Sequence, residues 1–258
     1  MITAHPTSKA FRVLAAVSLS IASFAASAGT IYWTDWTSSS SVGGFTGLGT
    51  ITTPTSTVNV TYNNPQGIAF FQASGGTDYY TNGLFSGVRN PASSPYTSPL
   101  VDNIPTGTDI VALTFAGNQT LTFSETIANP VFSYVSLNGN GYAFNQDFDI
   151  LSFGNPSDGN DCGYWGCGTS TKNIVDLGGG LFEYQLLGTG EPHGTLRFTG
   201  AFDSVSWRSL SNENWNGFTV GIQGTADEVF NGVPEPSTLA LFGAALAGLG
   251  LSRKKKRS

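Results

Sequence analysis

The sequence is poor in charge, histidine and cysteine. Charged residues make up 11% of its 258 residues and hydrophobic residues 40%, a composition that excludes a coiled coil or a highly charged disordered polymer. Two cysteines and one central imidazole, that of His193, are too few for a closed structural zinc site. No G-x-S-x-G motif accompanies that histidine, so nothing indicates a serine hydrolase.

Positive charge is almost absent from the middle of the chain. Seven of the eleven basic residues lie in the two termini. Residues 29–232 keep four bases against sixteen carboxylates, which gives this part a net charge of −12. Because an acidic domain repels phosphate backbones, we expect no nucleic-acid partner.

The N-terminus has the features of a secretory signal peptide. Lys9 and Arg12 precede an apolar run over residues 13–25, which is followed by Ala26, Ser27 and Ala28 before Gly29. A basic region, a short apolar core and an A-x-A site predict cleavage by signal peptidase between Ala28 and Gly29. The alternative is a buried helix of the mature fold, but the small residues at Ala26 and Ala28 favour cleavage. Residues 1–28 are therefore expected to form a signal helix that is removed.

The C-terminus combines a short motif, an apolar stretch and a basic end. The motif consists of Val233, Pro234, Glu235, Pro236 and Ser237. An apolar stretch over residues 238–251 and a basic cluster over residues 253–257 follow it. A helix over residues 237–252 would be about 24 Å long, which is less than the roughly 30 Å of a bilayer's hydrocarbon core. The positive-inside rule keeps the basic cluster on the cytoplasmic side, so the segment predicts transient anchoring in the inner membrane.

These last residues, 233–258, closely resemble the PEP-CTERM sorting signal of Gram-negative bacteria. The resemblance implies that an exosortase, a membrane-embedded protease, removes the tail near Pro234-Glu235-Pro236. It also implies a protein of the cell surface or extracellular matrix in bacteria that make exopolysaccharide, and this polymer is then a candidate partner. The alternative is an ordinary C-terminal membrane anchor, for which a short, glycine-rich helix is poorly suited.

Residues 29–232 are expected to form one β-sandwich domain. Apolar and polar residues alternate over many short runs that are bounded by Gly, Asn, Pro and Asp, and no run shows a sustained helical period. We expect an all-β fold, an antiparallel β-sandwich with jelly-roll-like topology, with a closed barrel as the alternative. The strand order cannot be derived. The predicted strands cover residues 56–62, 109–115, 119–123, 130–137, 142–150, 181–187, 195–198, 204–207 and 218–222.

Two segments depart from this pattern. Residues 34–57 contain thirteen Ser or Thr among twenty-four positions, which fits a flexible arm, a glycosylated stalk or an edge strand, and we favour the edge strand. Residues 89–108 contain four prolines, which remove backbone donors and predict a long surface loop.

The two cysteines, Cys162 and Cys167, are expected to form a disulfide after export into an oxidising compartment. Closing six residues stabilises by about 2 kcal/mol on the chain-entropy formula. The C-x₄-C spacing disfavours a redox role. The closed loop displays Tyr164 and Trp165, and a rigid aromatic pair offers contact area at low entropic cost. We therefore predict ligand binding at these two residues.

An oxygen-rich segment directly precedes the cysteines. Asp158, Asn160 and Asp161 supply the ligand type that Ca²⁺ takes, although the same residues are common in ordinary turns. The segment lacks the spaced acidic ladder of an EF-hand. We expect no cofactor, with Ca²⁺ at these three residues as the open alternative.

Catalytic groups are few. Asp147 and Asp149 lie two apart on a predicted strand, so both project from one sheet face, where they could flank a glycosidic bond or simply be solvated. His193 is best explained as a turn residue between two strands. The leading hypothesis is therefore an exported, non-enzymatic surface or extracellular-matrix protein. The alternatives are a carbohydrate-binding, lectin-like module and, third, a polysaccharide hydrolase.

Overall fold

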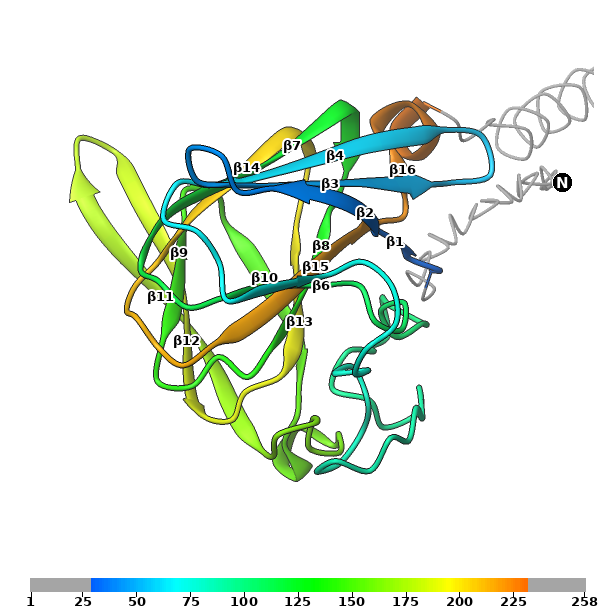
Figure 1. Ribbon diagram of the computed structural model, residues 1–258, viewed down its shortest axis with the longest axis vertical. Coiled ribbons are helices and arrows are strands. Elements are labelled where there is room, and N and C mark those ends of the chain that lie inside the picture. Colours follow the sequence, from blue (N-terminus) through cyan, green and yellow to red (C-terminus); the bar gives the residue numbers. More distant parts are fainter. Residues whose placement is uncertain (1–28, 232–258) are drawn as a thin grey trace, which may run out of the picture.

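The computed structural model describes residues 29–231, which form two antiparallel β-sheets packed face to face (Figure 1). This confirms the β-sandwich expected from the alternating pattern. The expected flanking helices fall in residues 1–28 and 232–258 and lie outside the described residues. Within the described part, no helix is long and apolar enough to cross a membrane.

The smaller sheet has seven strands and the larger sheet has nine. The strands of the seven-stranded sheet are β1 (Tyr32–Trp33), β5 (Phe70–Gln72), β6 (Ile110–Leu113), β8 (Val131–Val135), β10 (Phe148–Phe153), β13 (Gly194–Phe198) and β15 (Asn216–Ile222). The strands of the nine-stranded sheet are β2 (Asp35–Ser40), β3 (Phe45–Thr52), β4 (Thr57–Asn64), β7 (Gly117–Ala128), β9 (Gly141–Phe144), β11 (Gly168–Gly178), β12 (Leu181–Gly190), β14 (Ala201–Ser209) and β16 (Gly224–Thr225). Two short helical turns, η1 (Pro156–Asp158) and η2 (Asp227–Asn231), complete the described fold.

The strand orders show that the chain crosses repeatedly between the sheets, as in a jelly roll. The seven-stranded sheet has the order β10-β13-β8-β15-β6-β5, with β1 also paired to β15. The nine-stranded sheet has the order β11-β12-β9-β14-β7-β4-β3-β2, with β16 also paired to β7. Consecutive strands β8, β9, β10 and β11 alternate between the two sheets.

Aromatic side chains dominate the core between the sheets. Phe132 of β8 stacks on Phe218 of β15 with ring centroids 4.8 Å apart, and Trp207 of β14 meets both rings edge-on. Trp207 is 3% exposed and Val205, two residues earlier on the same strand, is 1% exposed. This face of β14 is therefore part of the buried core.

The single strand predicted over residues 142–150 is wrong. The structure divides it into β9, in the nine-stranded sheet, and β10, in the seven-stranded sheet. The apolar alternation continues across the turn because Phe144 and Phe148 enter the same core from opposite sheets, with ring centroids 5.4 Å apart. Periodicity alone cannot distinguish this crossing from one long strand.

The Ser/Thr-rich segment over residues 34–57 contributes regular sheet structure. Its first strand, β2, is the outermost strand of the nine-stranded sheet, and β3 lies next to it. The three serines that end β2 are exposed. The preferred interpretation as an edge strand is therefore confirmed for β2.

The proline-rich loop is longer and better packed than its composition suggests. No strand or helix forms between Gln72, the end of β5, and Ile110, the start of β6. Nevertheless Tyr80 and Tyr96 are fully buried and pack with Ile110 in a second hydrophobic cluster. The expected surface loop thus carries a small core of its own, because two tyrosines bury enough apolar area to hold it on the sandwich.

Candidate functional site

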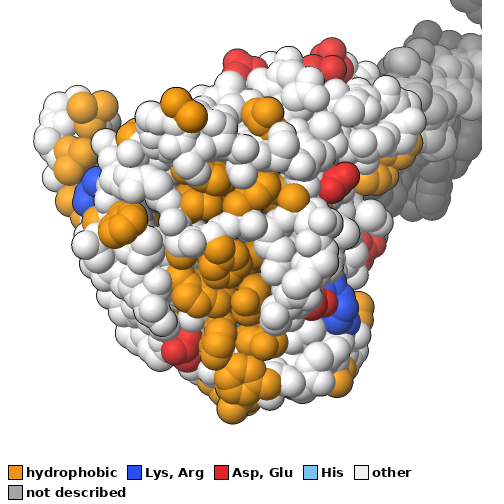
Figure 2. All heavy atoms as spheres, in the orientation of Figure 1, with side chains coloured by type: hydrophobic (Ala, Val, Ile, Leu, Met, Phe, Trp, Pro, Cys, Tyr) orange, Lys and Arg blue, Asp and Glu red, His pale blue; other side chains and the backbone are white. Residues whose placement is uncertain are grey.

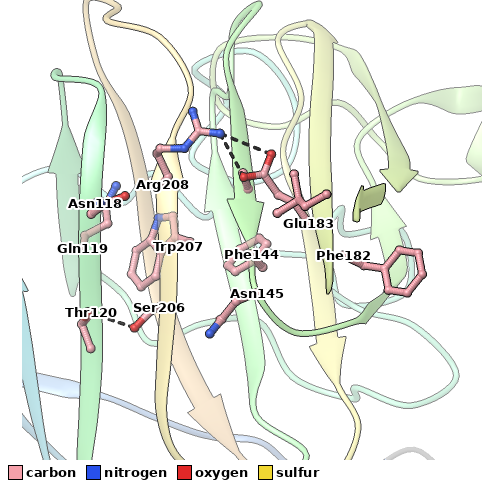
Figure 3. Close-up of a pocket in the computed structure, with 12 residues that line it drawn as sticks. Asn118, Gln119, Thr120, Phe144, Asn145, Phe182, Glu183, Ser206, Trp207 and Arg208 are labelled. Carbon is pink, nitrogen blue, oxygen red and sulfur yellow. Dashed lines mark hydrogen bonds and ion pairs between the residues drawn. The ribbon is translucent and has the colours of Figure 1, made fainter. Parts of the chain in front are cut away.

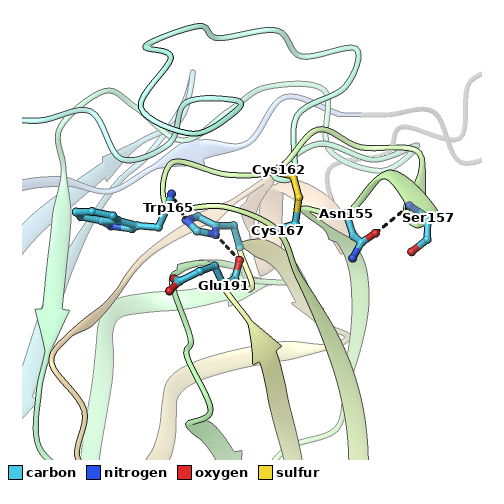
Figure 4. Close-up of a disulfide and its surroundings, with 7 residues drawn as sticks. Asn155, Ser157, Cys162, Trp165, Cys167 and Glu191 are labelled. Atoms are coloured by element: carbon cyan, nitrogen blue, oxygen red, sulfur yellow. Dashed lines mark hydrogen bonds between the residues drawn. A yellow bond between two sulfur atoms is a disulfide. The ribbon is translucent and has the colours of Figure 1, made fainter.

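The disulfide loop at one end of the sandwich is a tight turn. Cys162 and Cys167 are joined with their Cα atoms 4.4 Å apart (Figure 4). Between them, the backbone N–H of Gly163 donates to the carbonyl of Gly166 at 3.0 Å, and that of Gly166 donates back at 3.2 Å. Tyr164 and Trp165 stand at the tip of this turn, as the sequence predicted, and both side chains are partly exposed.

A buried histidine supports the loop from below. His193 lies between β12 and β13, as expected for a turn residue, but it is fully buried. Its Nδ1 lies 2.9 Å from the carbonyl oxygen of Glu191, which assigns the proton to Nδ1, and its Nε2 accepts from the backbone N–H of Trp165 at 3.4 Å (Figure 4). Desolvation lowers the pKa of His193 to about 4, so the ring is neutral at pH 7.

The long loop between β5 and β6 is fastened to the disulfide loop. Asp161 accepts hydrogen bonds from Asn82 at 3.0 Å and from Ser93 at 2.6 Å, and these bonds lower the pKa of its carboxyl group. The backbone N–H of Phe85 donates to the carbonyl of Tyr164 at 3.0 Å. Phe85 has a φ of 50°, which bulky residues seldom adopt, and its side chain is 56% exposed. The two loops thus hold an aromatic ring in solvent.

Six aromatic side chains form one connected group, which we call the aromatic surface. Its members are Phe70, Tyr79, Phe85, Tyr164, Trp165 and Trp215. Every ring contacts at least two others, with centroids between 5.0 and 6.0 Å apart, mostly edge to face. The rings come from β5, the long loop, the disulfide loop and the segment before β15.

The aromatic surface is partly exposed to solvent and packs on buried side chains. Phe85 is exposed, and the other five rings are partly exposed. Trp165 and Trp215 pack against the buried cluster that contains Tyr80 and Tyr96. In the orientation of Figure 1, hydrophobic side chains gather in a patch that runs from the middle of the face, where β6 and β15 lie, to its lower end (Figure 2).

Sequence reasoning found only two of the six rings. Tyr164 and Trp165 were identifiable because the disulfide closes around them. Phe70, Tyr79 and Phe85 lie about 80 residues or more before that loop, and Trp215 lies fifty residues after Trp165. No local pattern separates these rings from core aromatics, and only their convergence in the fold does so.

Every basic side chain in residues 29–231 is already paired. Arg89 lies 2.6 Å from Asp78, Arg197 lies 3.6 Å from Asp149, Arg208 lies 2.9 Å from Glu183, and Lys172 pairs with Asp147. The other twelve of the sixteen carboxylates have no ion-pair partner within the described part of the chain. The domain therefore presents negative charge and no unpaired basic side chain among these residues.

The residues predicted for acid–base chemistry are not arranged as a pair. Asp147 lies in the turn before β10, whereas Asp149 lies on β10 itself, so the expected shared strand is wrong. Both carboxylates are exposed and each pairs with a different base, Lys172 and Arg197 respectively.

The oxygen-rich segment before the disulfide is engaged in internal hydrogen bonds. Asp158 accepts from the backbone N–H of Phe153 at 3.1 Å and from the amide of Asn160 at 2.9 Å. Asp161 instead reaches across to Asn82 and Ser93. Within residues 29–231, no group of three or more His, Cys, Asp or Glu is placed to hold a metal ion. Calcium binding at Asp158, Asn160 and Asp161 stays an untested alternative.

The comparisons with known proteins bear on the C-terminal tail. A family model described as the PEP-CTERM protein-sorting motif matches residues 232–254, which contain the expected motif from Val233 to Ser237. These residues, like the signal cleavage site at Ala26, Ala28 and Gly29, fall outside or at the edge of the described part of the chain. A search of curated proteins and a search of solved structures each found no match.

Proposed function

We propose that this exported protein, which carries a PEP-CTERM motif for sorting by an exosortase, is a non-enzymatic protein of the cell surface or extracellular matrix that binds neutral polysaccharide. The aromatic surface carries the proposal. Six rings from four separate segments converge on one partly exposed surface, and a disulfide and a buried histidine fix the loop that carries two of them. Exosortase acts on the tail, and signal peptidase is the expected second processing partner.

Aromatic rings suit sugars because pyranose rings have faces of C–H groups that pack on a π-system. Tyr and Trp add polar atoms that can bond to sugar hydroxyls at the edge of the contact. Rings that are fixed before binding lose little conformational entropy when a ligand arrives. Phe85 is such a ring, because the hydrogen bond from its backbone to Tyr164 holds it beside Trp165, with ring centroids 5.0 Å apart.

The charge distribution favours neutral over acidic polysaccharides. All four bases of residues 29–231 are neutralised by carboxylates, and twelve further carboxylates remain. A uronate polymer would be repelled at low salt and would find no unpaired basic side chain in this part of the protein. A neutral glycan pays no such electrostatic cost.

The contacts of Glu213, two residues before Trp215, support binding without hydrolysis of the glycan. Burial raises the pKa of Glu213 to about 7, which would suit a general acid. However, one carboxylate oxygen of Glu213 is buried without a partner and the other accepts a hydrogen bond from Asn216. A catalytic acid must reach the glycosidic oxygen, whereas Oε2 of Glu213 is buried and Oε1 is bonded to Asn216.

Affinity for exopolysaccharide tests the proposal. The probe is the exopolysaccharide that the producing cells secrete, separated by anion exchange into neutral and acidic fractions, and the protein is the exported, processed form. We expect retention on the neutral fraction only. The Phe85→Ala variant should bind about tenfold more weakly, as expected for one ring of a shared contact. Phe230→Ala is the matched control, because Phe230 is 50% exposed in η2 and has no ring contact with the aromatic surface.

Incubation with the same fractions separates binding from hydrolysis. A binding protein releases no new reducing ends at any pH between 4 and 8. Sustained release of reducing ends that is lost in a Glu213→Gln variant would instead establish a hydrolase. Equal retention of wild type and Phe85→Ala would show that the aromatic surface is not the binding site.

A further inference from the structure

The outer face of the nine-stranded sheet has an unusual composition. Outward-facing residues of β3, β4, β7 and β14 form two neighbouring rows across the four strands. The first row is Thr46, Asn63, Thr120 and Ser206, and the second contains Thr61 and Thr122. Leu48 and Ser204 end the second row, so the two rows carry no charged side chain. We call this area the hydroxyl face.

The strand register aligns these side chains closely. Thr46 pairs with Asn63, Asn63 with Thr120, and Thr120 with Ser206, each on adjacent strands. Thr46 donates to the amide oxygen of Asn63 at 3.0 Å, and the hydroxyls of Thr120 and Ser206 are 3.0 Å apart. Neighbouring strands lie about 4.8 Å apart, so one row spans roughly 14 Å.

A cleft of about 390 Å³ opens where this row reaches Ser206. Its lining comes from β7, β14, β9, β11 and β12 and includes Asn118, Asn145 and the exposed Leu177 near the end of β11. Figure 3 shows Thr120 and Ser206 on adjacent strands, with Arg208 reaching across to Glu183. Arg208 and Glu183 neutralise one another at 2.9 Å, so the cleft has hydrogen-bonding groups without net charge.

Most solvated sheet faces carry long charged side chains, which resist desolvation and lose much rotamer entropy when they are covered. Ser, Thr and Asn are short, so immobilising them costs less. Their hydroxyls and amides both donate and accept, which matches the hydroxyls of a sugar polymer. A face of this composition is suited to a neutral, hydroxyl-rich chain rather than to an anion.

We propose that the hydroxyl face and its cleft form a second polysaccharide site, so that one protein molecule cross-links two neutral chains. This inference rests on the proposed function of the aromatic surface. The two surfaces are separate, because the aromatic surface is built on β5 and on loops at the end of the sandwich, whereas the hydroxyl face is the outer side of the opposite sheet. Two weak sites on one rigid body give avidity and a network.

The test uses the exported, processed protein and the neutral fraction of the exopolysaccharide. One variant, Thr122→Lys with Ser206→Arg, places long side chains over the row and the cleft. A second, Phe85→Ala with Trp165→Ala, removes two rings of the aromatic surface. The control is Thr171→Lys, an exposed strand threonine on β11 outside both surfaces. Each variant is checked for an unchanged fold by circular dichroism, and both retention and turbidity of the polymer solution are measured.

Wild type and Thr171→Lys should bind and make the solution turbid. Each site variant should keep about a tenth or more of the binding but lose the turbidity, because one site cannot bridge two chains. Full turbidity with Thr122→Lys and Ser206→Arg would overturn the second site and leave the aromatic surface intact. Loss of all binding in that variant, with none lost in the aromatic variant, would overturn the proposed function of the aromatic surface instead. Absence of wild-type binding would overturn both.

Discussion

His193 lies directly beneath the disulfide loop, where its Nε2 accepts a hydrogen bond from the backbone N–H of Trp165 at 3.4 Å. The same ring packs so closely under Gly163 that a Cβ at that position would overlap it. The imidazole therefore fixes the positions of the disulfide loop and of Trp165. Its neutrality and its volume both have consequences that can be measured.

Gly163→Ala should destabilise the protein by about 1–3 kcal/mol, because the new methyl group must push away a fully buried ring. Chemical denaturation measures this change. In a His193→Ala background the space beneath the loop is free, so the same Gly163→Ala change should cost much less. Equal costs in the two backgrounds would show that the ring does not set the loop.

Stability should fall as the pH drops from about 6.5 toward 4. An unfolded histidine takes up its proton near pH 6.5, whereas burial lowers the folded pKa of His193 to about 4. The unfolded state thus binds more protons in this window, and His193 contributes a loss of about 3 kcal/mol across it. The free energy of unfolding, measured by denaturation at several pH values, should depend less on pH in the His193→Gln variant. An unchanged pH slope in that variant would contradict the assignment.

Glu213 should change the pH dependence of stability in the opposite direction to His193. Desolvation raises its folded pKa to about 7, so the folded state binds more protons between pH 4.5 and 7 and loses stability as the pH rises through that window. Glu213→Gln keeps an oxygen for the bond from Asn216 and removes the charge. The variant should melt higher than wild type at pH 8 and similarly at pH 4.5. Glu125→Gln, at an exposed position on β7, should show no such difference.

Removing the disulfide should cost about 2 kcal/mol, because it closes a loop of only six residues. The Cys162→Ser, Cys167→Ser double variant should also bind the neutral polysaccharide more weakly, since Tyr164 and Trp165 lose their fixed positions. In freshly exported wild type, alkylation should label neither cysteine until a reductant is added. Labelling without reductant would show that the loop is open in the cell.

Mass spectrometry of the mature protein should find a chain that starts at Gly29 and ends near Pro236. Replacing Pro234, Glu235 and Pro236 by alanine should leave the protein in the inner membrane, because exosortase no longer recognises the tail. An intact basic end at residues 253–258 on surface-exposed protein would contradict this processing. Unchanged release of the alanine variant from the membrane would show that exosortase does not recognise the motif.

Local patterns predicted the sandwich because each strand buries alternate residues, and alternation is visible in any stretch of sequence. They failed between Tyr142 and Ile150, where the chain crosses from one sheet to the other without breaking the apolar pattern. They also missed the packing of the long loop, since nothing local shows that the rings of Tyr80 and Tyr96, both within this loop, pack with centroids 5.2 Å apart.

The sequence by itself determined the export route, the all-β class and the disulfide partner. Each of these depends on contiguous residues or on a choice between only two cysteines. The tertiary structure alone decided which aromatic rings reach solvent together and which hydroxyls align across strands. Phe70, Phe85, Trp165 and Trp215 become neighbours only when the sheets and loops pack. Contacts between distant segments arise from the packing of the whole chain. The local sequence pattern of each segment does not reveal them.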